Sequence, residues 1–93
     1  MYVAILYTYT DDVEKRMATR SAHRDFLVAN PGLRIAGATE AGGGIIVVEA
    51  ETAEEVETWI EGDPYRAAGL VADRTVTPWG AAIGSWVAEL GLA

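Results

Sequence analysis

The sequence lacks cysteine and holds a single histidine, His23, among its 93 residues. Without thiols the chain cannot form a disulfide, an iron–sulfur cluster or a thiolate zinc site. One imidazole is too few for the histidine clusters that bind transition metals, which leaves a cation held by carboxylates as the open alternative. We therefore predict that the chain works without a metal or an organic cofactor.

Basic residues are also scarce, since seven lysines and arginines face fourteen acids and give a net charge of −7. They form no run that could follow a phosphate backbone or an anionic membrane surface, so the sequence predicts neither nucleic acid nor membrane as a partner. No apolar stretch approaches the length of a transmembrane helix, and no signal peptide is evident at the amino terminus. These features predict a cytoplasmic protein.

Hydrophobic residues make up 51% of the chain, and their pattern predicts a βαββαβ order with an added C-terminal helix. Capping boxes at Asp11 and Thr52 start the first two helices, and Gly/Pro turns separate the elements. The predicted strands are 2–9, 33–39, 45–50 and 71–78, and the predicted helices are 11–29, 52–61 and 81–90. This order is that of a single α+β, ferredoxin-like domain, with a core at 1–79 and a helical tail at 80–93.

The first and third strands are apolar on both faces, although two helices can cover only one face of the sheet. Val3 and Ile5 alternate with Ala4 and Leu6, and Ile45 to Val48 are all aliphatic. The second face must be covered by a partner or by the tail. We predict a symmetric homodimer with the sheets face to face, because closed two-fold dimers are the commonest assembly. The alternative is a monomer whose tail folds back over the sheet. We also predict that the tail packs Ile83, Trp86, Val87 and Leu90 against apolar surface, because their spacing defines one helix face.

The first helix carries basic residues within its apolar face. Arg16, Arg20, His23 and Leu27 are spaced i, i+4, i+7 and i+11, which places them in one narrow sector. Burying three potential cations together is costly unless each has a partner or a ligand. A binding site for an anionic or polar small molecule would meet that need. The alternative is structural, with a hydrogen-bonded histidine and arginine stems that cover apolar surface.

Asp63 stands between Gly62 and Pro64, where the simplest interpretation is turn chemistry after a helix. Paired with His23 it would have a further role. A carboxylate that accepts from one ring nitrogen fixes the tautomer and leaves the other nitrogen free to move a proton.

The sequence resembles the YCII family over nearly its whole length. The segments that carry the resemblance are Glu14-Lys15-Arg16 with Arg20 and His23, Ala36-Gly37, Asp63-Pro64-Tyr65, Ala68-Gly69, Val76 and Pro78-Trp79. The resemblance implies a dimeric α+β barrel, a pocket between helix and sheet that includes Gly37, and His23 with Asp63 as the active-site pair. One branch of that family eliminates chloride from a chlorinated hydroxyquinol, and the fold is similar to that of muconolactone isomerases.

These observations leave three functions open. The first is a cofactor-free lyase or isomerase, in which His23 is the general base and acid and Asp63 orients it. Arg16 or Arg20 would anchor an anionic oxygen, and Tyr65 and Tyr7 would line the site. The second is a module that binds a small metabolite without converting it, and the third is a dimerisation partner that has no pocket.

Overall fold

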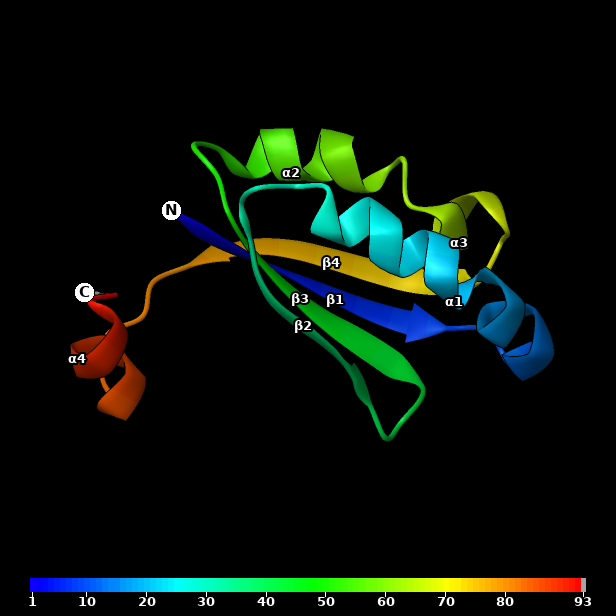
Figure 1. Cartoon of the computed structure of the whole chain (residues 1–93), viewed down its shortest axis with the longest axis horizontal. Helices are drawn as coiled ribbons and strands as arrows, with labels where there is room; N and C mark the ends of the chain where they lie inside the picture. Colours follow the sequence, from blue (N-terminus) through cyan, green and yellow to red (C-terminus); the bar gives the residue numbers. More distant parts are fainter. Residues whose placement is uncertain (93) are drawn as a thin grey trace.

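The computed structural model describes residues 1–92 and has the predicted element order with one additional short helix (Figure 1). The strands are β1 (Tyr2–Tyr9), β2 (Leu33–Thr39), β3 (Gly43–Glu49) and β4 (Val71–Trp79). The helices are α1 (Val13–Val28), α2 (Ala53–Ile60), α3 (Pro64–Ala67) and α4 (Ser85–Leu90). The four strands form one antiparallel sheet in the order β2-β3-β1-β4, which confirms the α+β, ferredoxin-like fold.

Side-chain caps set the helix starts. The Thr52 side chain accepts a hydrogen bond from the Glu55 backbone N–H at 3.2 Å, so α2 begins as predicted. The cap of α1 is Asp12, which accepts from Lys15 N–H at 3.0 Å, and not Asp11. The first helical bond of α1 explains the shift, because Arg16 N–H donates to the Asp12 carbonyl.

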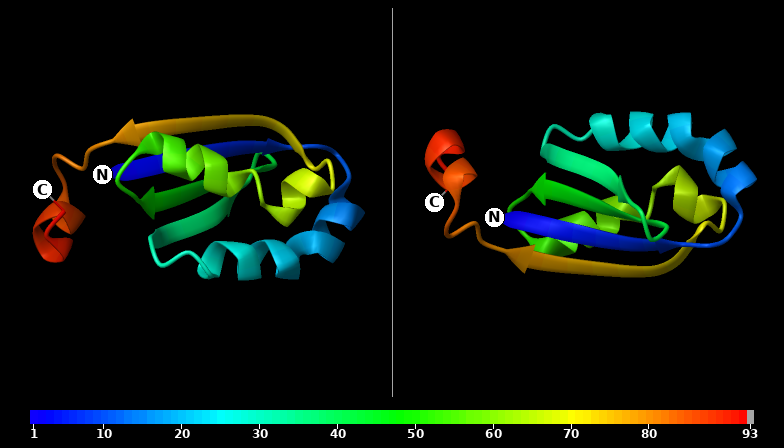
Figure 2. Two further views of the ribbon diagram at one scale, coloured as in Figure 1. Left: turned by 90° about the horizontal axis from the view of Figure 1, so that it is seen from above. Right: turned by 90° about the horizontal axis from the view of Figure 1, so that it is seen from below.

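Both main helices cover the same face of the sheet (Figure 2). The core lies between these helices and the sheet. The strands contribute alternate residues to it, Val3, Ile5 and Tyr7 from β1 and Ile46 and Val48 from β3. The helices add Leu27, Val56 and Ile60. This period of two places every second strand residue against the helices and the others on the opposite face.

The opposite face of the sheet is apolar and bare. Leu6, Ile35 and Ile45 are 43%, 54% and 45% exposed. Leu6 lies directly opposite Ile45 in the β1–β3 pairing, and Ile35 lies opposite Val47 in the β2–β3 pairing, so the patch is continuous across three strands. The apolar second face predicted from the sequence is therefore present, and the described chain does not cover it.

The tail differs from its prediction. The last helix begins at Ser85 and not at residue 81, because Gly84 has φ +124°, a backbone conformation outside the helical region. Ile83, Trp86 and Leu90 are 93%, 61% and 64% exposed, and α4 lies away from the sheet (Figure 1). The alternative in which the tail folds back over its own sheet is therefore wrong. No helix within residues 1–92 is long and apolar enough to cross a bilayer.

Few residues on the inward face of α1 are buried. His23 and Leu27 are buried, but Met17 and Val28 are 58% and 72% exposed. Arg20 is exposed as well, which corrects the expectation that the arginines are buried. The physical reason is a cavity that separates this side of α1 from β2 and β3, so that long side chains reach an open space rather than a packed core.

Candidate active site

Asp63 lies at the junction of α2 and α3 and is fully buried. Its side chain caps α3 by accepting the Tyr65 N–H at 3.0 Å, and it accepts the Tyr7 hydroxyl at 2.8 Å. It also contacts His23 Nδ1, at 2.8 Å from Oδ1 and 2.9 Å from Oδ2. The carboxylate therefore both caps the turn and contacts the histidine, so the predicted turn and the predicted pair are both present.

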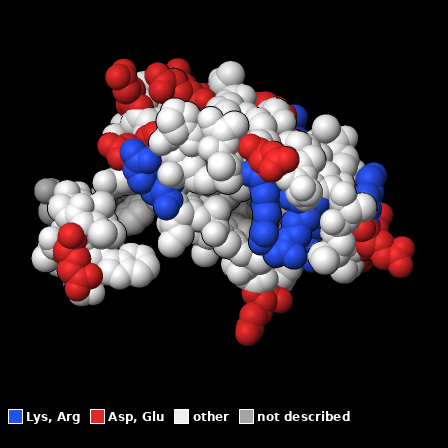
Figure 3. Space-filling view, in the orientation of Figure 1, with Lys and Arg blue, Asp and Glu red and all other residues white. Residues whose placement is uncertain are grey.

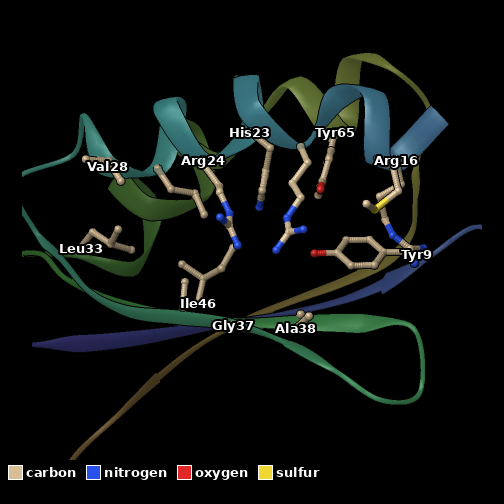
Figure 4. Close-up of a pocket in the computed structure, with 15 residues that line it drawn as sticks. Tyr9, Arg16, His23, Arg24, Val28, Leu33, Gly37, Ala38, Ile46 and Tyr65 are labelled. Carbon is tan, nitrogen blue, oxygen red and sulfur yellow. The ribbon is translucent and has the colours of Figure 1, made fainter. Parts of the chain in front are cut away.

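His23 reaches this carboxylate from the middle of α1, and the residue is 8% exposed. Its ring stacks on the Tyr65 ring, with centroids 3.8 Å apart and planes within 6°. An ionised carboxylate only accepts hydrogen bonds, so Nδ1 carries the proton that is donated to Asp63. In the neutral ring Nε2 is then the unprotonated nitrogen, and the His23 ring points into the cavity (Figure 4).

Three tyrosines surround the pair. Burial, the main cause, and the hydrogen bond to Asp63, the second, raise the pKa of Tyr7 well above its usual range. The Tyr7 hydroxyl therefore stays protonated and acts as a donor. Burial raises the pKa of Tyr9 to about 12, and burial also raises the pKa of Tyr65. Tyr7 lies behind Asp63 and outside the cavity lining, so it holds the carboxylate and does not face the open space.

The cavity lies between α1, the β2–β3 side of the sheet and α3, and its volume is about 500 Å³. That size suits a small metabolite. Five of the predicted site residues line it, namely Arg16, Arg20, His23, Gly37 and Tyr65. The wall opposite α1 includes the small residues Ala36, Ala38 and Gly44, whose side chains take up little of the cavity. A side-chain carbon on Gly44 would lie 2.6 Å from the Tyr9 hydroxyl, so glycine there leaves room for the Tyr9 ring.

Two polar residues that line this cavity, Arg24 and Tyr9, were not predicted from the sequence. Arg24 follows Arg20 by four residues, and this i, i+4 spacing was a signal that could have identified it. Tyr9 ends β1, and the Arg16 guanidinium lies 4.8 Å from the centre of its ring. This cation–π contact crosses from strand to helix and has no signature in sequence spacing.

A second hollow, of about 810 Å³, lies between the end of α1 and α2. The charged residues that line it are all acids, Glu49, Glu51 and Glu55, and no histidine faces it. The smaller cavity is the better candidate because it contains the paired His23. Across residues 1–92, no cluster of three or more histidines and carboxylates is arranged to hold a metal ion.

The chain is similar in sequence and in fold to known proteins. Protein YciI of Escherichia coli is 29% identical to the chain, over 85% of the chain and 95% of the relative, and Protein YciI of Shigella flexneri matches equally. The 5-chloro-2-hydroxyhydroquinone dehydrochlorinase of Burkholderia phenoliruptrix, solved with 2,5-dihydroxybenzoquinone, superposes with a TM-score of 0.80. Its identity is 24% over 88% of this chain and 96% of that one, a likeness of fold. The model of the YCII-related domain matches residues 1–80, and the chain belongs to this family.

Proposed function

We propose that the protein is a small cofactor-independent lyase or isomerase that moves a proton on a polar or anionic metabolite through His23. The observation that carries the proposal is the buried carboxylate on His23 Nδ1, 2.8 Å away, with the rest of the ring directed at a cavity. A histidine held in this way presents Nε2 as a general base, and the carboxylate stabilises the imidazolium that forms.

In the proposed reaction, Nε2 removes a proton from a substrate carbon, and the electron pair of that C–H bond forms a new double bond. In an isomerisation an existing double bond of the substrate breaks as the new one forms, and the atom that receives its electron pair takes the proton back from the imidazolium. In an elimination a leaving group departs with its bonding pair, and the proton passes from the imidazolium to solvent. Arg16 and Arg20 line the cavity and would stabilise the oxygen on which negative charge develops.

The likeness to a dehydrochlorinase supports this class of reaction. That enzyme is named for an elimination, and it shares the fold over 88% of this chain. Shared fold alone does not fix chemistry, so the proposal depends on the His23–Asp63 geometry. Tyr9 and Tyr65 both line the cavity, and aromatic rings in the lining favour a planar substrate.

The test is an exchange experiment in D2O. Wild-type protein is incubated with enolisable oxo acids and hydroxylated aromatic compounds, including 5-chloro-2-hydroxyhydroquinone, and mass spectrometry detects deuterium uptake or loss of a leaving group. We expect at least one compound to react, and His23→Gln to slow that reaction by about 100-fold or more. Arg34→Gln is the control, because Arg34 lies on β2 outside the cavity. Compounds that bind without exchange or elimination would instead indicate a binding module.

We also propose that the protein is a homodimer formed through the bare sheet face. Leu6, Ile35 and Ile45 on that face are each more than 40% exposed in one chain. A continuous apolar patch of this kind is a typical interaction surface, and a second copy supplies an identical patch in a two-fold arrangement.

A further inference from the structure

The cavity is strongly basic, although the protein is strongly acidic. Three of its seven basic residues, Arg16, Arg20 and Arg24, line the cavity, and no aspartate or glutamate is among the lining residues. Figure 3 shows basic side chains gathered at the hollow beneath α1. A concentration of one charge sign in a concave site attracts ligands of the opposite sign.

The three arginines are held in one row by the helix. They are spaced i, i+4 and i+8, so they share one side of α1 and extend over about 12 Å at 1.5 Å per residue. Like charges at this spacing repel one another along a helix. The four ion pairs that arginine and histidine form within residues 1–92 involve Arg34, Arg66, Arg74 and His23, and none involves this row.

His23 lies between the ends of the row. Figure 4 shows Arg24 on one side of His23 and Arg16 on the other; the His23 and Arg24 side chains point into the cavity, and the Arg16 guanidinium lies at its edge against Tyr9. Arg16 is partly fixed, since it lies over the Tyr9 ring and donates to the Thr10 carbonyl at 3.4 Å. Within residues 1–92, Arg24 makes no such contact and is exposed, so its guanidinium is available to bind a ligand.

We infer that the ligand of this cavity is a planar dianion with an acidic group on each side of His23, and that Arg24 determines the preference for the second acidic group. Arginine binds carboxylates and phenolates through charge-assisted, often bidentate hydrogen bonds. Because Ala36, Ala38 and Gly44 are small, they leave space for a flat ring between the sheet and α1. This inference rests on the proposed function and adds the chemical class of the ligand at the same site.

The experiment measures binding alone, with benzoate and its three dicarboxylate relatives, phthalate, isophthalate and terephthalate, as probes. Calorimetry, or the ring signals of the single histidine, reports each affinity. We expect at least one dicarboxylate to bind wild-type protein about tenfold or more tightly than benzoate, and Arg24→Gln to reduce that ratio to within about threefold. Arg34→Gln removes the same charge away from the cavity and is expected to keep the wild-type ratio.

Equal binding of benzoate and all three dicarboxylates would overturn the inference, as would an unchanged ratio in Arg24→Gln. These results are independent of the D2O exchange experiment. Proton exchange without dianion preference would reject only the inference, and dianion preference without any exchange or elimination would reject only the proposed catalysis.

Discussion

Replacing Tyr7 with phenylalanine removes one hydroxyl from the site and leaves the ring in the core. That hydroxyl donates to Asp63 Oδ2 at 2.8 Å, and Asp63 is fully buried. A hydrogen bond to a charged group contributes about 1.5–3 kcal/mol. Because the phenyl ring stays, there is little added cost from a cavity. We expect the free energy of unfolding to fall by about 1.5–3 kcal/mol, which in a domain of this size lowers Tm by roughly 6–24 °C.

Urea unfolding followed by circular dichroism at a fixed protein concentration measures this loss. Tyr9→Phe is the matched control, because the Tyr9 hydroxyl points into the cavity (Figure 4) and bonds to no protein atom within residues 1–92. We expect the control to change stability by less than about 0.5 kcal/mol. Equal losses in the two variants would refute the account of Tyr7 as the residue that holds Asp63.

Asp63→Asn and His23→Gln should each lower activity, and combining them should cost far less than the sum of the single losses, because the bonded pair acts as one unit. Leu6→Glu on the bare sheet face should convert the proposed dimer to monomer in light scattering, while the control Val13→Glu, at an exposed position on α1, should not. Burial raises the pKa of Tyr9 to about 12, so the folded state retains a proton that the unfolded state loses near pH 10. Stability should therefore fall as pH rises from about 10 to 12, and fall less in Tyr9→Phe.

The fold could be predicted from sequence because local signals and global pattern agree. The apolar alternation of Val3, Ile5 and Tyr7 corresponds to the buried face of β1, and the Thr52 cap starts α2 as expected. The tail could not be placed in this way. Its apolar spacing resembles a packed helix face, but spacing does not say which surface it covers, and Trp86 is exposed in the single chain.

The His23–Asp63 pair could be predicted because two separate sequence signals combine. His23 was unusual on an inward helix face and Asp63 followed a helix end, and the topology brings them to 2.8 Å. Tyr7 was predicted to line the pocket, but its position in the period-two pattern of β1 places it in the core behind Asp63. Arg24 was missed because the predicted helix face continues from Arg20 through His23 and Leu27, although the four-residue spacing of the arginines continues from Arg20 to Arg24.

The tautomer of His23 tests the central claim most directly. The chain contains one histidine, so a long-range ¹H–¹⁵N spectrum of uniformly labelled protein shows a single ring and needs no assignment. Recorded at a pH where the ring is neutral, it identifies the nitrogen that carries the proton. The account predicts a proton on Nδ1, donated to Asp63, and an unprotonated Nε2 facing the cavity. A proton on Nε2 in the wild-type protein would contradict it, because that nitrogen could not then act as the base.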